Sequence, residues 1–150
     1  MRLPKNFLVS TEWLEAHLDD PTVRIVDCRY AFDHDCREDY DAGHIPGAVY
    51  LNWDRALSDA NHRVAFMIAP ADQVMAAMEA IGVGDNTLLV AYDQEGGHFA
   101  ARVWLVLARH GKGDRVRILD GGWTAWAQEG RPTTTEPPQL PATGSTHFYV

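Results

Sequence analysis

Residues 90–104, VAYDQEGGHFAARVW, combine an apolar run, a short glycine-containing turn and a helix-like pattern. A turn of this kind presents backbone N–H groups at the N-terminus of a helix, where they bind an anion or activate a nucleophilic thiol. The first residue of the turn is Asp93, an acid, which is the residue type that an anion site least favours. The segment is therefore a working active site, a ligand cradle, or the remnant of a site that has lost its chemistry.

Asp93 has two interpretations. As a cap, its side chain accepts the N–H groups of the following helix that an anion would otherwise bind. As a functional group, it acts with Glu95 and His98 in acid–base chemistry, or binds a cation together with Glu95. The capping interpretation is favoured, because a helix N-terminus stabilises the ionised carboxylate and makes it a poor base near neutral pH.

The two cysteines are predicted to be structural. Cys28 lies in an apolar run and is interpreted as a small buried residue. Cys36 lies in an acidic segment, where neighbouring carboxylates raise the pKa of a thiol. Neither cysteine precedes a glycine turn and a helix. Free thiols in a reducing compartment are favoured over a bridge between the two.

Residues 33–36, DHDC, together with Asp39, Asp41 and His44, suggest a metal site. Their spacing fits no compact zinc pattern of the C-x-x-C or H-x-x-x-H kind, and a solvated acidic loop is the favoured interpretation. The Gly96-Gly97 pair fits neither a phosphate-binding loop nor a dinucleotide fingerprint. We therefore predict no metal ion and no cofactor.

Length and composition predict one globular domain. The chain has 150 residues, of which 46% are apolar and 23% charged. Its net charge of −8 disfavours nucleic acid and anionic membranes as partners. No apolar run approaches the roughly 20 residues of a membrane span, and the first residues lack the apolar core of a secretory signal. A cytoplasmic location is expected.

Apolar runs and helical patterns alternate along the chain, which predicts a parallel sheet covered on both faces. Residues 30–43 are predicted to form a long loop or a frayed helix. From Arg131 the chain is rich in proline and threonine, so we predict a domain at residues 1–132 and an interdomain linker or tail at 133–150. Strands are predicted at residues 23–29, 48–53, 87–92 and 116–120, and helices at 10–18, 70–81, 99–111 and 121–130.

Four segments together resemble the rhodanese, or thiosulfate sulfurtransferase, family. They are IVDCR at 25–29, DYDAGHIPGAVYLNW at 39–53, the segment 90–104, and RILDGGWTAW at 117–126. The resemblance covers about residues 9–132 and is strongest to the N-terminal halves of tandem rhodaneses. It implies an α/β fold with a central parallel five-stranded sheet flanked by helices on both faces.

The resemblance also implies a loss of chemistry. In an active member, the residue after the central strand is a cysteine that takes a sulfane sulfur from thiosulfate or 3-mercaptopyruvate, holds it as a persulfide and passes it to a thiophilic acceptor. The corresponding residue here is Asp93, which cannot form a persulfide. The rest of the degenerate loop consists of Gln94, Glu95, Gly96, Gly97 and His98.

A non-catalytic domain is therefore implied, one that packs against a C-terminal catalytic rhodanese domain of the same parent chain and shapes its active-site cleft. The alternative is a standalone inactive rhodanese-like module that binds a protein or a small ligand. A second rhodanese domain after residue 150 would favour the first of these.

Two pairs of residues complete the expected site. In mercaptopyruvate-type tandem enzymes, the histidine of the GHIPGA-like motif and an upstream aspartate are proposed to join a serine of the C-terminal domain in a proton relay. The matching histidine is His44, and Asp35 is the nearest candidate for the acid. The alternative is that His44 only pins its loop to the sheet. Asp27 and Arg102 are expected to pair beneath the degenerate loop as structural residues.

Overall fold

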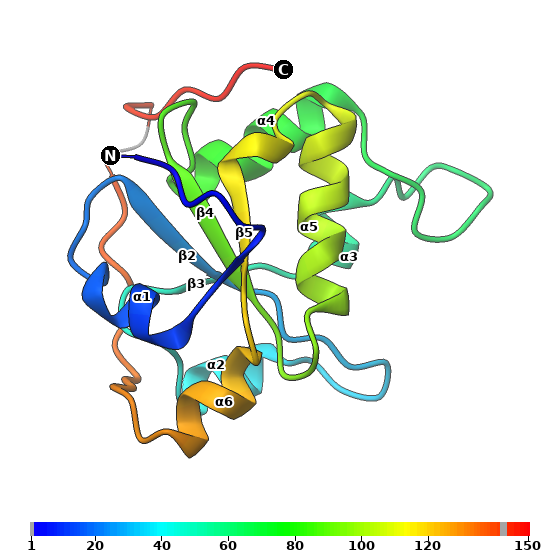
Figure 1. Cartoon of the computed structure of the whole chain (residues 1–150). Coiled ribbons are helices and arrows are strands. Elements are labelled where there is room, and N and C mark those ends of the chain that lie inside the picture. Colours follow the sequence, from blue (N-terminus) through cyan, green and yellow to red (C-terminus); the bar gives the residue numbers. More distant parts are fainter. Residues whose placement is uncertain (1, 142–143) are drawn as a thin grey trace.

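The structure, a computed structural model, describes residues 2–141 and 144–150. Its centre is a sheet of five parallel strands in the order β1-β5-β4-β2-β3 (Figure 1). The predicted α/β fold with a five-stranded parallel sheet is confirmed. The strands are Leu8–Val9 (β1), Val23–Asp27 (β2), Val49–Tyr50 (β3), Leu88–Tyr92 (β4) and Val116–Leu119 (β5).

The central strand β4 is buried along its whole length between β2 and β5. Successive side chains of a strand point to opposite faces, so a central strand of a covered parallel sheet supplies two cores at once. This explains why its sequence is almost continuously apolar. Leu88, Val90 and Tyr92 lie in one core, and Leu89 and Ala91 lie in the other.

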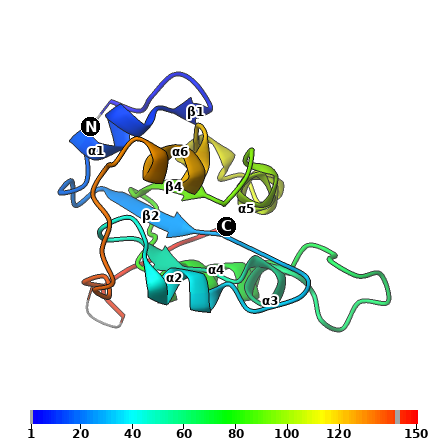
Figure 2. The same ribbon diagram turned by 90° about the horizontal axis from the view of Figure 1, so that it is seen from below.

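Helices cover both faces of the sheet. One core contains residues of α3 (Trp53–Leu57), α4 (Ala71–Ala80) and α5 (His98–Arg109). The other contains residues of α1 (Thr11–Ala16), α2 (Arg37–Ala42) and α6 (Gly122–Gln128). Figure 2 shows α1 and α6 on one side of β2 and β4, with α3 and α4 on the other. A short 3-10 helix, Gly113–Arg115, leads into β5.

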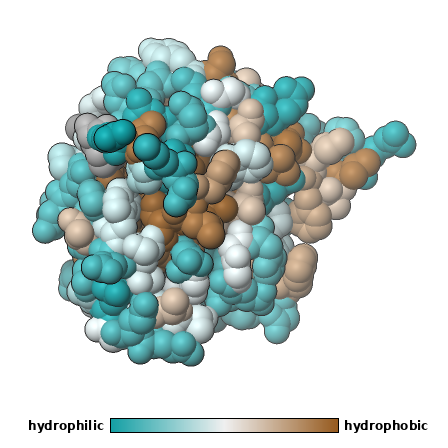
Figure 3. All heavy atoms as spheres, in the orientation of Figure 1, coloured by the Kyte–Doolittle hydropathy of each residue, from teal (hydrophilic) through white to brown (hydrophobic). Residues whose placement is uncertain are grey.

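Three short elements differ from the sequence-based prediction. The strand predicted at 48–53 is limited to β3, because the Asn52 side chain accepts the N–H of Arg55 and starts α3. The segment 30–43 contains the regular helix α2. Strand β1 was not predicted, since its two residues pair with β5 but are too few to show a periodic pattern. Figure 3 shows an apolar patch on the face of the molecule that is also seen in Figure 1. Among the residues of and beside β1, Phe7 and Leu8 are each 50% exposed.

The described residues of the tail return over the domain. Thr134 and His44 exchange two backbone hydrogen bonds of 2.9 Å. Farther on, Phe148 is 2% exposed in the core, and its N–H donates to Glu79 at 3.0 Å. The C-terminal residues HFYV form no strand in this structure. The domain boundary at residue 132 stays a prediction, whereas the packing of Phe148 makes the tail part of the folded unit.

Among the helices of the described residues, none combines the length and apolar character needed to cross a membrane.

The buried position of Phe148 leads to a first prediction. Replacing Phe148 with alanine should lower the free energy of unfolding by about 3 kcal/mol, because it removes a large side chain from the core. Urea denaturation of both chains measures this difference. The neighbouring Tyr149 is 62% exposed, so Tyr149→Ala is the matched control and should change the value by less than about 0.5 kcal/mol. Equal effects of the two substitutions would show that the tail does not anchor the fold.

Candidate functional site

The loop predicted to carry the site lies where β4 ends and α5 begins. Strand β4 brings the chain out of the sheet at its carboxyl end, which is where open α/β sheets place their ligand sites. The first residue of the loop, Asp93, is fully buried. A carboxylate that is removed from water needs hydrogen-bond donors around both of its oxygens.

Four backbone N–H groups surround the Asp93 carboxylate, and we call these four groups the cradle. One oxygen, Oδ1, accepts from Glu95 at 2.8 Å and from Gly97 at 3.1 Å. The other, Oδ2, accepts from Phe99 at 2.9 Å and from Ala100 at 3.0 Å, both in the first turn of α5. The carboxylate therefore caps α5 from the position of a bound anion. The capping interpretation is confirmed.

Glycine at position 97 makes this geometry possible. Gly97 has a φ of +98°, a left-handed conformation that L side chains rarely adopt. It is the N-cap residue of α5 but has no side chain that could accept an N–H group. Asp93, four residues earlier, supplies the acceptor in its place.

The turn before α6 packs against the backbone of the loop that contains Asp93. A Cβ atom on Gly122 would lie 2.5 Å from the carbonyl oxygen of Asp93, so only glycine allows this approach. The same carbonyl accepts the N–H of Trp123 at 2.8 Å, and the Thr124 hydroxyl donates to the Gln94 carbonyl at 2.8 Å. The GGWT sequence of residues 121–124, which follows β5, thus holds the cradle in position through contacts with the backbone of Asp93 and Gln94.

Polar side chains at the mouth of the loop do not join Asp93. Gln94 bonds both backbone groups of Tyr30, accepting its N–H at 3.2 Å and donating to its carbonyl. Glu95 and His98 pair with each other at 3.3 Å, and both side chains are more than half exposed. Because both Asp93 oxygens are already engaged, a shared cation site of Asp93 and Glu95 is not formed.

Neither cysteine is activated as a nucleophile. Cys28 is fully buried in the core, and burial, assisted by the charges of Asp27 and Asp93, raises the pKa of its thiol well above the usual value. Burial and a hydrogen bond with Asp39 raise the pKa of Cys36 to about 12. Since the thiolate is the reactive form, both thiols are suppressed as nucleophiles. This agrees with their predicted structural roles.

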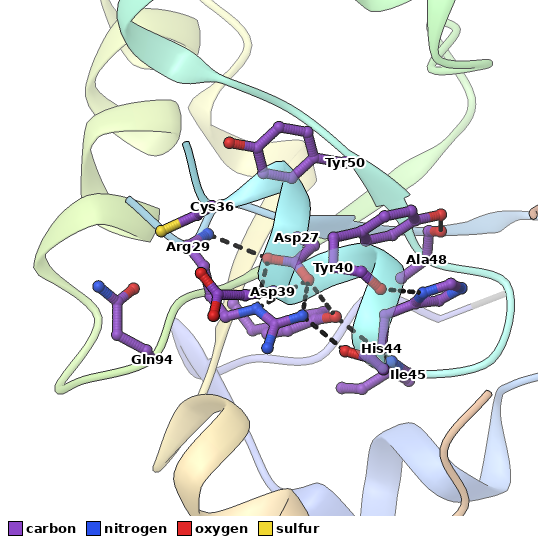
Figure 4. A network of polar contacts seen from close by, with 12 residues as sticks. Asp27, Arg29, Cys36, Asp39, Tyr40, His44, Ile45, Ala48, Tyr50 and Gln94 are labelled. Atoms are coloured by element: carbon purple, nitrogen blue, oxygen red, sulfur yellow. Dashed lines mark hydrogen bonds and ion pairs between the residues drawn. The ribbon is translucent and has the colours of Figure 1, made fainter. Parts of the chain in front are cut away.

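A buried ion pair lies beside the loop, at the end of β2 (Figure 4). Asp27 is fully buried and accepts from the Arg29 guanidinium at 2.7–3.1 Å and from the Tyr92 hydroxyl at 2.8 Å. Arg29 also donates to the Gly43 carbonyl at 2.7 Å and lies 4.5 Å from the centre of the Trp123 ring. The pair therefore connects the sheet end to the GHIPGA segment and to α6.

The expected pairing of Asp27 with Arg102 is wrong. Arg102 belongs to α5, on the opposite face of the sheet, where its guanidinium donates to the Phe66 carbonyl and lies 5.9 Å from the Trp53 ring centre. Arg29 is two residues after Asp27, and the period of a strand places both side chains on the same side. This local partner was visible in the sequence as D-C-R.

The two residues predicted to form a relay are engaged separately. The fully buried ring of His44 lies between two backbone carbonyls, with Nδ1 2.9 Å from Tyr40 O and Nε2 2.7 Å from Glu136 O. Asp35 instead accepts the N–H of Arg37 at 3.0 Å and contacts the Tyr50 hydroxyl at 3.5 Å. These contacts attach His44 to α2 and to the tail, and a relay across a domain interface stays a prediction.

The acidic segment is more organised than the predicted solvated loop. His34 Nε2 lies 2.8 Å from Asp39 Oδ2 and 3.7 Å from Cys36 Sγ, and the three ligand-type atoms all lie within 4.8 Å of one another. Asp41 points elsewhere and pairs with Arg37 at 3.0 Å. The spacing H-x-C-x-x-D lies outside the compact patterns considered from the sequence, so this grouping was missed.

Comparison with known proteins agrees with this architecture. The family model of the rhodanese-like domain matches residues 10–129. The chain belongs to the rhodanese family. This rhodanese domain is 37% identical over 134 residues to the sulfur carrier protein TtuD of Thermus thermophilus, which covers 89% of this chain and 44% of that protein. It is 34% identical over 127 residues to the 3-mercaptopyruvate sulfurtransferase of Escherichia coli K12, and the match covers 82% of this chain and 44% of that protein.

A solved structure gives the same result for the fold. The crystal structure of SseA from Escherichia coli, described as a 3-mercaptopyruvate sulfotransferase with a rhodanese fold, superposes on this rhodanese domain with a TM-score of 0.82 at 32% identity. The match covers 91% of this chain and 53% of that one. The chain thus spans about half the length of the relatives that it matches.

The cradle of this rhodanese domain leads to a second prediction. Asp93→Ala would leave four N–H groups without their acceptor and should lower the free energy of unfolding by at least about 2 kcal/mol. Chemical denaturation measures the loss. Glu95→Ala, which removes an exposed carboxylate of the same loop, is the control and should stay within about 0.5 kcal/mol of the unaltered chain. Unaltered stability of Asp93→Ala would mean that the carboxylate does not hold the cradle.

Proposed function

We propose that this chain is the non-catalytic rhodanese domain of a longer thiosulfate or 3-mercaptopyruvate sulfurtransferase. The observation that carries the proposal is the set of four hydrogen bonds between the cradle and the Asp93 carboxylate. A persulfide is an anion that would need the same N–H groups. The protein's own carboxylate occupies them, and neither cysteine lies in the loop.

The lengths of the relatives support a second domain. Curated relatives are about twice as long as the matched segment, and one of them is named a 3-mercaptopyruvate sulfurtransferase. In our proposal, the remaining half of the parent chain is a catalytic rhodanese domain. The present domain packs against it and shapes one wall of its active-site cleft.

Exposed aromatic side chains near the degenerate loop support a contact surface there. Phe32 is 79% exposed and Phe66 is 41% exposed, and their rings lie 6.4 Å apart. Tyr30, which is bonded to Gln94 of the loop, contacts Phe32 with its ring. Exposed apolar patches of this kind mark protein interfaces. We assign this surface to the catalytic domain.

His44 and Asp35 enter the proposal in different ways. The burial of His44 between the carbonyls of Tyr40 and Glu136 supports a positioning role, in which the ring holds α2 and the tail together. Asp35 is exposed beside Tyr50 and is free to face a partner domain. A cytoplasmic location belongs to the same proposal and is supported by two free cysteines, which fit a reducing compartment.

The proposal predicts that the 150-residue chain lacks sulfurtransferase activity. With thiosulfate or 3-mercaptopyruvate as donor and cyanide as acceptor, thiocyanate production should not exceed that of a Cys28→Ala, Cys36→Ser double variant. The parent protein, continued through a second rhodanese domain, should produce thiocyanate. Cysteine-dependent turnover by the 150-residue chain alone would contradict the proposal. A parent reading frame that ends at residue 150 would favour the standalone binding module instead.

A further inference from the structure

The geometry points to a Zn²⁺ site formed by His34, Cys36 and Asp39, on the segment that joins β2 to α2. The site is independent of the proposed sulfur chemistry, because none of its residues belongs to the cradle. Nitrogen, sulfur and oxygen ligands of these types are those that Zn²⁺ takes in proteins. The three residues bring them together without a contribution from another chain.

The three ligand atoms lie within 4.8 Å of one another, which is close to the spacing that a tetrahedral ion requires. Ligand atoms about 2.0–2.3 Å from Zn²⁺ lie about 3.3–3.6 Å apart in a tetrahedron. The separation of 3.7 Å between Cys36 Sγ and His34 Nε2 is just above this range. The 2.8 Å hydrogen bond between His34 Nε2 and Asp39 Oδ2 has to open by about half an ångström. Small side-chain rotations of His34 and Asp39, whose side chains are about half exposed, would accomplish this change.

A fourth residue orients the histidine. Asp33 Oδ1 lies 2.9 Å from Nδ1 of His34, on the ring nitrogen that is opposite the proposed ligand atom. A carboxylate in this position fixes the tautomer of a metal-binding histidine and raises its basicity, and most such histidines have a partner of this kind. The H-bonded pair therefore presents Nε2 of His34 to the ion.

The first residues of α2 direct the Cys36 sulfur toward the other two ligands. Cys36 is the N-cap residue of α2, but its side chain makes no capping hydrogen bond. Its Sγ is directed to His34 and Asp39 instead, and the residue is 4% exposed. Asp39 lies three residues later in the first turn, which returns its carboxylate to the sulfur (Figure 4 shows both residues). Local helix geometry thus assembles two of the three ligands.

Charge and softness favour Zn²⁺ over a hard cation. A bound thiolate and the Asp39 carboxylate together balance the two positive charges of the ion. Cys36 loses its proton to solvent as the sulfur–zinc bond forms, and the proton between His34 Nε2 and Asp39 Oδ2 is released to solvent as the nitrogen–zinc bond forms. Mg²⁺ and Ca²⁺ prefer oxygen ligands throughout and gain nothing from a thiol. The nearby cation, Arg29, is already bound to Asp27.

Three protein ligands leave one coordination position open. His34 and Cys36 line a cavity of about 300 Å³, together with Tyr50, Asn52 and Arg55. A water molecule in this cavity would complete the tetrahedron, as in zinc sites that keep an exchangeable ligand. Ion binding would also fix the segment that begins at Tyr30 and borders the degenerate loop.

Cobalt provides the direct test, because Co²⁺ occupies zinc sites and absorbs light according to its ligands. Titration of the unaltered, reduced chain with Co²⁺ should give a sulfur-to-cobalt charge-transfer band with a stoichiometry of one ion per chain. Added Zn²⁺ should abolish the band by displacement. Absence of the band in the unaltered chain overturns the proposal without reference to any variant.

Substitutions assign the ligands. Cys36→Ser should abolish the band. Asp33→Asn removes only the group that orients the histidine, so it should weaken Co²⁺ binding by roughly 10- to 100-fold. His34→Ala and Asp39→Asn remove ligands and should weaken Co²⁺ binding by more than this. Circular dichroism without metal verifies that each variant is folded.

Three matched controls should leave the band and the affinity unaltered. Cys28→Ala removes the other thiol, Asp41→Asn removes another acid of α2, and His98→Ala removes an exposed histidine that lies beside a carboxylate. A band that depends on Cys28, or an affinity that His34→Ala and Asp39→Asn do not change, contradicts the assignment.

Discussion

Four backbone N–H groups converge on one buried carboxylate, and the surrounding structure is organised to keep them there. A buried charge is tolerated only when its hydrogen-bonding capacity is filled, so Asp93 and the cradle depend on each other. Gly97 lets the chain turn into α5, and Gly122 lets a second strand end approach from behind. The loop therefore has the shape of an anion site whose anion is covalently part of the chain.

A second buried charge supports the same end of the sheet. Arg29 and Asp27 pair in the core, and through Tyr92, Gly43 and Trp123 they connect the central strand, the GHIPGA segment and α6. These residues surround the cradle but do not enter it. The motifs that mark the chain as a rhodanese thus mainly stabilise the surroundings of the cradle.

Local patterns explain what could be predicted from the sequence. The long apolar strand β4 and the cap at Asp93 depend on neighbouring residues, and both are found as predicted. Arg102 was wrongly assigned as the partner of Asp27. The partner is Arg29, because the two-residue period of a strand places its side chain on the same side as that of Asp27. The grouping of His34 with Asp39 was missed because it depends on α2, whose first turn directs the Asp39 carboxylate toward His34. Strand β1 lacked enough residues to show any period.

In the proposed function, the cradle holds a carboxylate in place of a sulfur carrier. The most direct test is the intact mass of the 150-residue chain after incubation with excess thiosulfate or 3-mercaptopyruvate and removal of the donor. The treated chain should have the same mass as the untreated chain, because no thiolate lies in the loop to accept sulfur. A stoichiometric gain of one sulfur atom, removed again by cyanide, would contradict the proposed function.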